Sequence, residues 1–132
     1  MTIRVLLLLL GLFHIVNGVW MLADPMGWYA AVPGVTASGA FNHHFICDIG
    51  FAFIASGAGM AAGFLPGLRN AVFAIAGSMW PALHGLFHIY GWIANGFPQA
   101  ADVRISDVVA VVAVSALGLV AALINGKREG AL

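Results

Sequence analysis

Four of the five histidines in this 132-residue chain lie in two tight clusters. His43 and His44 are adjacent, whereas His84 and His88 are four residues apart, a spacing that places both on one face of a helix. Both clusters lie in segments apolar enough to cross a bilayer, where an imidazole is costly to bury. Ionisable residues at such a depth indicate a functional site. These histidines are therefore the first candidates for the protein's chemistry.

Transition metals are the partners that such side chains suit best. Neutral imidazoles bind copper, zinc and iron, and a nearby carboxylate adds charge or orients an imidazole ring. Asp48 follows His44 by four residues, and Cys47 follows His43 by the same spacing, so each pair shares a helix face. We favour copper slightly, because a thiol or an amide could complete such a site. The candidate metal ligands are His14, His43, His44, Asp48, His84 and His88.

Haem is the main variant of this metal site. Two histidines on facing helices can hold the iron of a haem b between them. The 17 glycines of the chain could make room for the flat macrocycle, although small residues also serve close helix packing in lipid. A redox or electron-transfer role is the natural use of either kind of site. Neither kind by itself implies catalysis.

The composition predicts that helices in a membrane position these residues. Hydrophobic residues make up 62% of the chain and charged residues 8%, whereas soluble domains carry about 25% charged residues. Four stretches are long enough to span as helices, and short connectors make neighbouring spans antiparallel. The first is expected to be a retained span rather than a signal peptide. We therefore predict an all-α integral membrane fold, a single antiparallel four-helix bundle over residues 1–132, with spans at about 3–22, 41–65, 71–93 and 105–124.

Basic residues predict the orientation of these spans. Arg4, Arg69, Lys127 and Arg128 all fall on one face of a four-span protein, and Arg104 is the single basic residue in the opposite connectors. By the positive-inside rule, the face with four basic residues is cytoplasmic. Both termini are therefore expected in the cytoplasm of a bacterium, with the protein in its inner membrane. All five histidines then lie in the outer half of the bilayer.

This depth leads to a geometric prediction. Spans two and three should bring His44, Asp48, His84 and His88 within ligand distance of one centre. Asp107, at the outer end of span four, could face the histidines or could be a favourable acid in the first turn of a helix, and we favour the second interpretation.

Three further expectations concern the surroundings of the site. Asn42 should cap the second span, because its side chain can accept a free backbone N–H at a helix start. Residues 24–39 are predicted to be an irregular segment above the site, acting as a lid or as a fixed cap. For His14 alone we favour a structural hydrogen bond, worth about 0.6 kcal/mol on average in membrane proteins.

Two motifs carry a resemblance to a protein family. The pattern N-x-H-F-I-x-D-I-G over residues 42–50, followed by P-x-x-H-x-x-x-H over residues 81–88, resembles small uncharacterised bacterial proteins with four transmembrane helices. The resemblance covers spans two and three and implies the fold, the membrane location and the prominence of His44, Asp48, His84 and His88. An arginine often precedes the aspartate in that pattern, whereas this chain has Cys47. Without that arginine, Asp48 is freer to bind a metal or to pair with a histidine.

Other functional classes remain open at this point. The apolar fourth span fits an accessory subunit of a larger membrane oxidase or monooxygenase, with other membrane subunits or a homo-oligomer as partners besides lipid. Aspartate and histidine at membrane depth also occur in proton or solute carriers, but no second polar layer continues to the cytoplasmic face. Nucleic-acid binding is excluded because the formal net charge is zero and no basic patch is present.

Overall fold

All regular structure in the part of the chain that the computed structural model describes, residues 2–132, is helical. Three long helices are α1 (Ile3–Ala23), α3 (His43–Ala62) and α4 (Leu68–Asn95). A fourth long segment consists of α5 (Ala101–Ile105), the π-helical η2 (Ser106–Ala113) and α6 (Val114–Arg128). All four are long and apolar enough to cross a membrane. The predicted all-α class is confirmed, as is the presence of four helices with the length and apolar composition of membrane spans.

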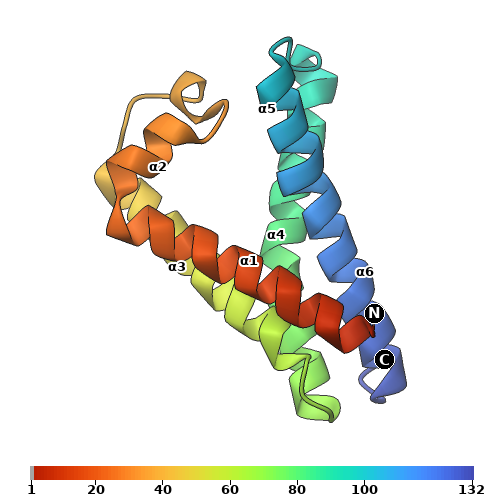
Figure 1. Cartoon of the computed structure of the whole chain (residues 1–132). Helices are drawn as coiled ribbons and strands as arrows, with labels where there is room; N and C mark the ends of the chain where they lie inside the picture. The colour runs from red at the N-terminus through yellow and green to blue at the C-terminus, as the bar shows by residue number, and fades with distance from the viewer. Residues whose placement is uncertain (1) are drawn as a thin grey trace.

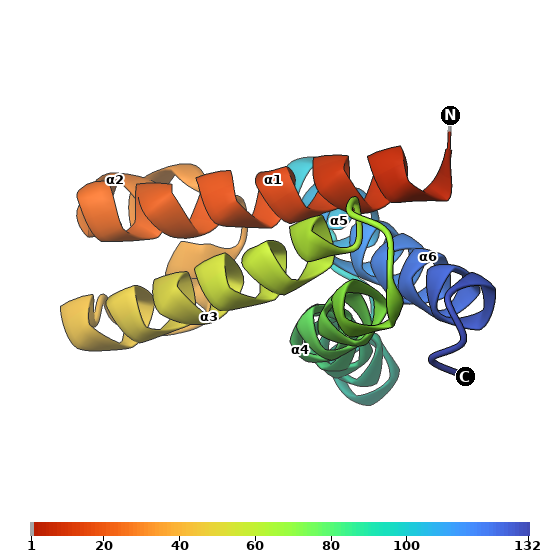
Figure 2. The same cartoon turned by 90° about the horizontal axis from the view of Figure 1, so that it is seen from below.

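The four spans form two helix pairs that diverge. α1 packs along α3, α4 packs along η2 and α6, and contacts of α3 with α4 and of α1 with α6 join the pairs. The pairs lie close together where both termini lie and separate toward α2 and α5 (Figure 1). Seen from below, α1 and α3 extend side by side away from α4 (Figure 2). The spans therefore do not run side by side over their whole length, as they would in a regular bundle.

Glycines let α1 and α3 touch backbone to backbone. A Cβ atom added to Gly57 would lie 2.5 Å from the carbonyl oxygen of Gly11, and one added to Gly18 would lie 2.5 Å from the carbonyl oxygen of Gly50. Because a later residue of α1 faces an earlier residue of α3, the two helices run in opposite directions. Contact this close is typical of helix pairs in lipid, where small residues replace the hydrophobic effect as the basis of packing.

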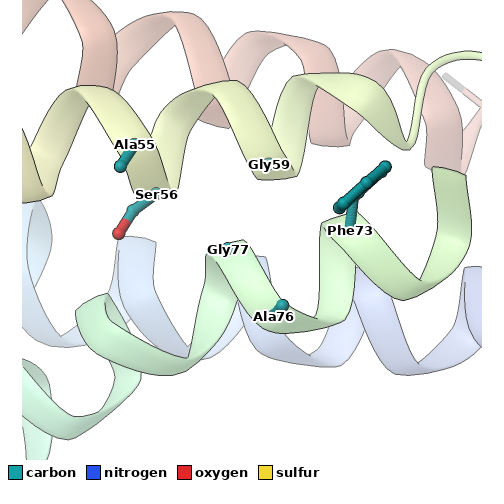
Figure 3. A pocket seen from close by; sticks show the side chains of 6 residues that line it. All are labelled: Ala55, Ser56, Gly59, Phe73, Ala76 and Gly77. Carbon is teal, nitrogen blue, oxygen red and sulfur yellow. The ribbon is translucent and has the colours of Figure 1, made fainter.

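Small residues also form the contact between α3 and α4. A Cβ atom added to Gly77 would lie 2.6 Å from the carbonyl oxygen of Ser56. Beside this contact lies a shallow hollow of about 280 Å³, shown from close by in Figure 3. Its lining contains no titratable side chain and consists of Ala55, Ser56, Gly59, Phe73, Ala76 and Gly77. We therefore interpret this hollow as a feature of helix packing and look elsewhere for the chemistry.

The segment 24–39 is more ordered than predicted. It contains α2 (Pro25–Ala31) and the short 3-10 helix η1 (Val35–Ala37). Asp24 accepts the backbone N–H of Gly27 at 2.9 Å, and a proline at the first helical position favours helix initiation. The indole of Trp28 donates to the side-chain oxygen of Asn17 at 3.0 Å, which fastens α2 to α1. The expectation of an irregular segment is wrong because it overlooked this capping sequence.

At the opposite end of the molecule, one carboxylate ties three parts of the chain together. The Arg4 guanidinium on α1 forms an ion pair with Glu129 after α6, and the Gly67 backbone N–H before α4 donates to the second carboxylate oxygen at 2.8 Å. The hydrogen bond from Arg4, with that from Gly67, holds the pKa of Glu129 below its usual range. This network therefore stabilises the fold most when Glu129 is ionised.

Glu129 should accordingly give the thermal stability a pH dependence. A carboxyl group with a lowered pKa in the folded state stabilises that state above its unfolded pKa, about 4.3, and this contribution is lost as the pH falls through the folded-state value. We expect Glu129→Gln to lower the Tm in detergent at pH 7, and the difference from the wild type to shrink as the pH approaches 3. A difference that is the same at every pH would contradict this account.

Candidate functional site

The histidines of α3 and α4 do not meet. Among residues 2–132, no three His, Cys, Asp or Glu side chains are arranged to hold one metal ion. The prediction that His44, Asp48, His84 and His88 converge on one centre is therefore wrong. The physical reason is the divergence of the helix pairs, because α3 begins at the far end of one pair and α4 belongs to the other (Figure 1).

The start of α3 carries two separate pairs of donors. As predicted, Asn42 caps the helix, and its side-chain oxygen accepts a backbone N–H at 3.0 Å. His44 Nε2 lies 3.3 Å from an Asp48 carboxylate oxygen, with side chains 89% and 58% exposed. His43 Nε2 lies 3.7 Å from the sulfur of Cys47. These pairs match the predicted spacing, but the high exposure makes the α3 pairs a less enclosed site than the histidines of α4.

The most enclosed histidine and carboxylate pair is His88 with Asp107. His88 Nδ1 lies 3.3 Å from a carboxylate oxygen of Asp107, and the two side chains are 25% and 14% exposed. The indole N–H of Trp92 donates to the same oxygen at 3.3 Å. A carboxylate beside Nδ1 favours the tautomer protonated there, which leaves the Nε2 lone pair available to a ligand. Of the two interpretations of Asp107, the less favoured one, that it faces the histidines, is the one that the structure supports, although Asp107 also lies in the first turn of η2.

Asp107 lies in an unusual helical segment. Residues Ser106–Ala113 of the fourth span are π-helical. Such segments are rare and often occur at functional sites. Asp107 was recognisable from its position at the depth of the histidines, but no sequence feature indicated the π-helix that carries this aspartate.

A continuous series of rings links the two helix pairs. The ring centroids of His84 and His88 are 4.8 Å apart, and His84 stacks on Trp80 at 5.4 Å with an angle of 5°. Trp80 contacts Phe53 of α3 edge to face at 4.8 Å, and Phe53 stacks on His14 of α1 at 5.5 Å. We call these five residues, with Asp107, the histidine layer. Trp80 was recognisable from its position four residues before His84, whereas Phe53 has no distinctive sequence context.

His14 is the buried end of the histidine layer. It is 2% exposed, and neither ring nitrogen has a hydrogen-bond partner within residues 2–132. The predicted structural hydrogen bond of His14 is therefore absent. Burying a polar group without a partner costs about 1–3 kcal/mol, so a ligand that engages one of these nitrogens would recover that free energy. The arrangement can supply imidazole nitrogens from both helix pairs.

Comparisons with known proteins identify no relative. No protein-family model matches the chain, and neither curated proteins nor solved structures show significant similarity to it. The resemblance of the α3 and α4 motifs to four-span bacterial proteins stays a prediction. The functional argument therefore depends on the chemistry of the histidine layer.

Proposed function

We propose that the protein holds a haem within the membrane and uses it in a redox or electron-transfer role. The observation that carries the proposal is the position of Asp107 beside His88 Nδ1, with Trp92 donating to the same carboxylate oxygen. A histidine oriented in this way by a carboxylate is a typical metal ligand, because the carboxylate fixes the tautomer and raises the basicity of Nε2. His88 is therefore the proposed axial ligand.

The number of available donors favours haem over an ion held by the protein alone. Structural zinc sites take four protein ligands and catalytic zinc sites take three. No group of three suitable side chains exists within residues 2–132. A haem brings four nitrogens of its own and needs only one or two axial ligands, for which a proximal histidine suffices. The observed donors match this smaller requirement.

The rest of the histidine layer has roles in the same proposal. Trp80 and Phe53 offer flat apolar surfaces beside the histidines of α4, against which a planar macrocycle could pack. His14 lies beyond Phe53 in the ring series, with Trp80 and His84 between it and His88, so we do not propose that it binds the same iron. When bound, a haem with histidine ligands supplies one-electron chemistry, and the protein controls its potential through axial ligands and burial.

Copper is the second candidate, and a specific observation favours it. His84 and His88 are neighbours on one face of α4, with ring centroids 4.8 Å apart. Imidazoles suit copper, and two nitrogens from one helix need little reorganisation to approach one ion. This site would need a further ligand from outside the pair, for which a small molecule is the candidate.

Titration of the purified protein separates these two proposals. We expect detergent-solubilised protein to bind haemin saturably at about one haem per chain, with a sharp Soret band in place of the broad absorption of free haemin. Copper is titrated in parallel, with metal content measured after gel filtration. The matched control is His43→Ala, which removes an exposed histidine outside the histidine layer. Retention of copper but not haem would favour the second candidate, and retention of neither would refute both.

The proposed location is a bacterial inner membrane with both termini in the cytoplasm. The basic residues Arg4, Arg69, Lys127 and Arg128 support this orientation. It places the start of α3 on the outer side, where the single cysteine Cys47 is partly accessible. A membrane-impermeant maleimide should therefore label Cys47 in intact spheroplasts.

A second cysteine variant controls for accessibility. In a protein carrying Cys47→Ser and Arg69→Cys, the new thiol lies in the first turn of α4, on the opposite side in the proposed orientation, so labelling should require permeabilised membranes. The reverse pattern of labelling would show that the proposed orientation is inverted.

A further inference from the structure

A second candidate site lies at the end of the molecule where the two termini meet. A cavity of about 410 Å³ occupies this end, which is within the size range of ligand pockets, about 300–1,000 Å³. Figure 1 shows the beginning of α1 beside the end of α6 at this place. The cavity is lined by Thr2, Ile3, Arg4, Asn125, Arg128 and Glu129. It is separate from the histidine layer and contains no histidine.

Asn125 gives this cavity an unmet hydrogen-bonding requirement. The side chain is 1% exposed, and its nitrogen donates to the Gly63 carbonyl oxygen at 3.5 Å. Its side-chain oxygen has no partner among residues 2–132. Because leaving a buried carbonyl unsatisfied is costly, a group that donates an N–H or O–H to Asn125 would bind favourably here.

The charges of the lining favour an anion. Arg4 and Arg128 carry two positive charges and Glu129 carries one negative charge, so the lining has one positive charge in excess. Glu129 is paired with Arg4, whereas Arg128 forms no ion pair within residues 2–132. A phosphodiester, with a single negative charge, would balance the lining and accept charge-assisted hydrogen bonds from the guanidinium groups.

We propose that this cavity binds the headgroup of an anionic, hydroxyl-bearing phospholipid of the phosphatidylglycerol class. The phosphodiester contacts Arg128 and Arg4, and a headgroup hydroxyl donates to the side-chain oxygen of Asn125. A lipid is favoured over a soluble phosphate ester because the cavity lies at the ends of two spans and is partly lined by the apolar Ile3. Basic pockets between transmembrane helices on the cytoplasmic side, where the proposed orientation puts this cavity, bind anionic headgroups such as that of cardiolipin.

Lipid retention in native mass spectrometry tests this proposal. The whole protein is exchanged into detergent micelles containing equal amounts of phosphatidylglycerol and phosphatidylcholine, which lacks a headgroup donor and a net charge. We expect phosphatidylglycerol to be retained about tenfold more strongly, and Arg128→Gln to abolish this preference, because a charge-assisted hydrogen bond is lost. Lys127→Gln is the matched control, since it removes the same charge from a neighbouring residue that does not line the cavity.

The outcomes are distinct. Preference for phosphatidylglycerol in the wild type and in Lys127→Gln, but not in Arg128→Gln, supports the proposal. Equal retention of the two lipids, or an unchanged preference in Arg128→Gln, would overturn it. Free glycerophosphoglycerol, the headgroup phosphodiester without its acyl chains, is added in a third arm at the same concentration as the lipid. Displacement of the lipid by that soluble ester would overturn the assignment to a lipid, and failure to displace it supports the assignment.

Discussion

His88→Ala is expected to abolish saturable haem binding while the protein remains folded. His88 is the imidazole whose Nδ1 faces Asp107, so its Nε2 is the best oriented nitrogen for the iron. An alanine at this position removes the only bond from α4 to the metal in the proposed arrangement. In a haemin titration, the Soret band of the variant should remain that of free haemin. His43→Ala should titrate like the wild type, because His43 lies outside the histidine layer.

Asp107→Asn tests whether the carboxylate acts through His88. Losing a carboxylate that orients a metal-binding histidine typically weakens the metal affinity by about 10–100-fold. We therefore expect a weaker but still saturable titration in this variant, with the reduction potential of the bound haem shifted. A purely structural aspartate would change the Tm without shifting the potential. Unchanged haem affinity in both His88→Ala and Asp107→Asn would eliminate His88 as the axial ligand.

Gly57→Leu is expected to have the largest effect on the fold. A Cβ atom at this position would lie 2.5 Å from the Gly11 carbonyl oxygen, so backbone would have to move to admit any side chain. Overpacking of a close-packed contact, with the backbone shifts that it forces, costs about 1–3 kcal/mol and occasionally more. The variant should lose the sharp thermal transition of the wild type in detergent and elute as aggregate from gel filtration.

The chain offers a matched control for the Gly57 substitution. Gly91 also lies in a long apolar helix, α4, but no heavy atom lies within 4 Å of the Cβ that would be added there. Gly91→Leu should therefore retain the Tm of the wild type within a few degrees. If Gly57→Leu is equally stable, then the backbone contact between α1 and α3 does not determine the fold.

The sequence predicted the elements of the fold better than their arrangement. Apolar stretches of about 20 residues predict the four spans, because a helix of that length matches the hydrocarbon thickness. Asn42 predicts where α3 begins, because asparagine is one of the few residues that cap a helix N-terminus effectively. The divergence of the helix pairs was not predictable in the same way. It depends on which glycines face one another, such as Gly11 and Gly57, and a pattern of small residues does not specify partners.

In the candidate site, too, local geometry was predictable from the sequence and contacts between spans were not. The i,i+4 spacing of His84 and His88 was sufficient to predict that their rings are neighbours, since this follows from helix geometry. Convergence with His44 and Asp48 required an assumption that the spans lie side by side over their full length. The pairing of His88 with Asp107 joins residues from different spans, so it depends on the rotation of the π-helical η2, which the sequence does not reveal.

The most direct test of the proposed haem site is the absorption spectrum of the protein as purified from bacterial membranes, recorded together with its iron content. We predict a Soret band and about one iron per chain, both present in His43→Ala and absent from His88→Ala. A preparation that melts cooperatively but has neither a Soret band nor bound iron would contradict the proposal.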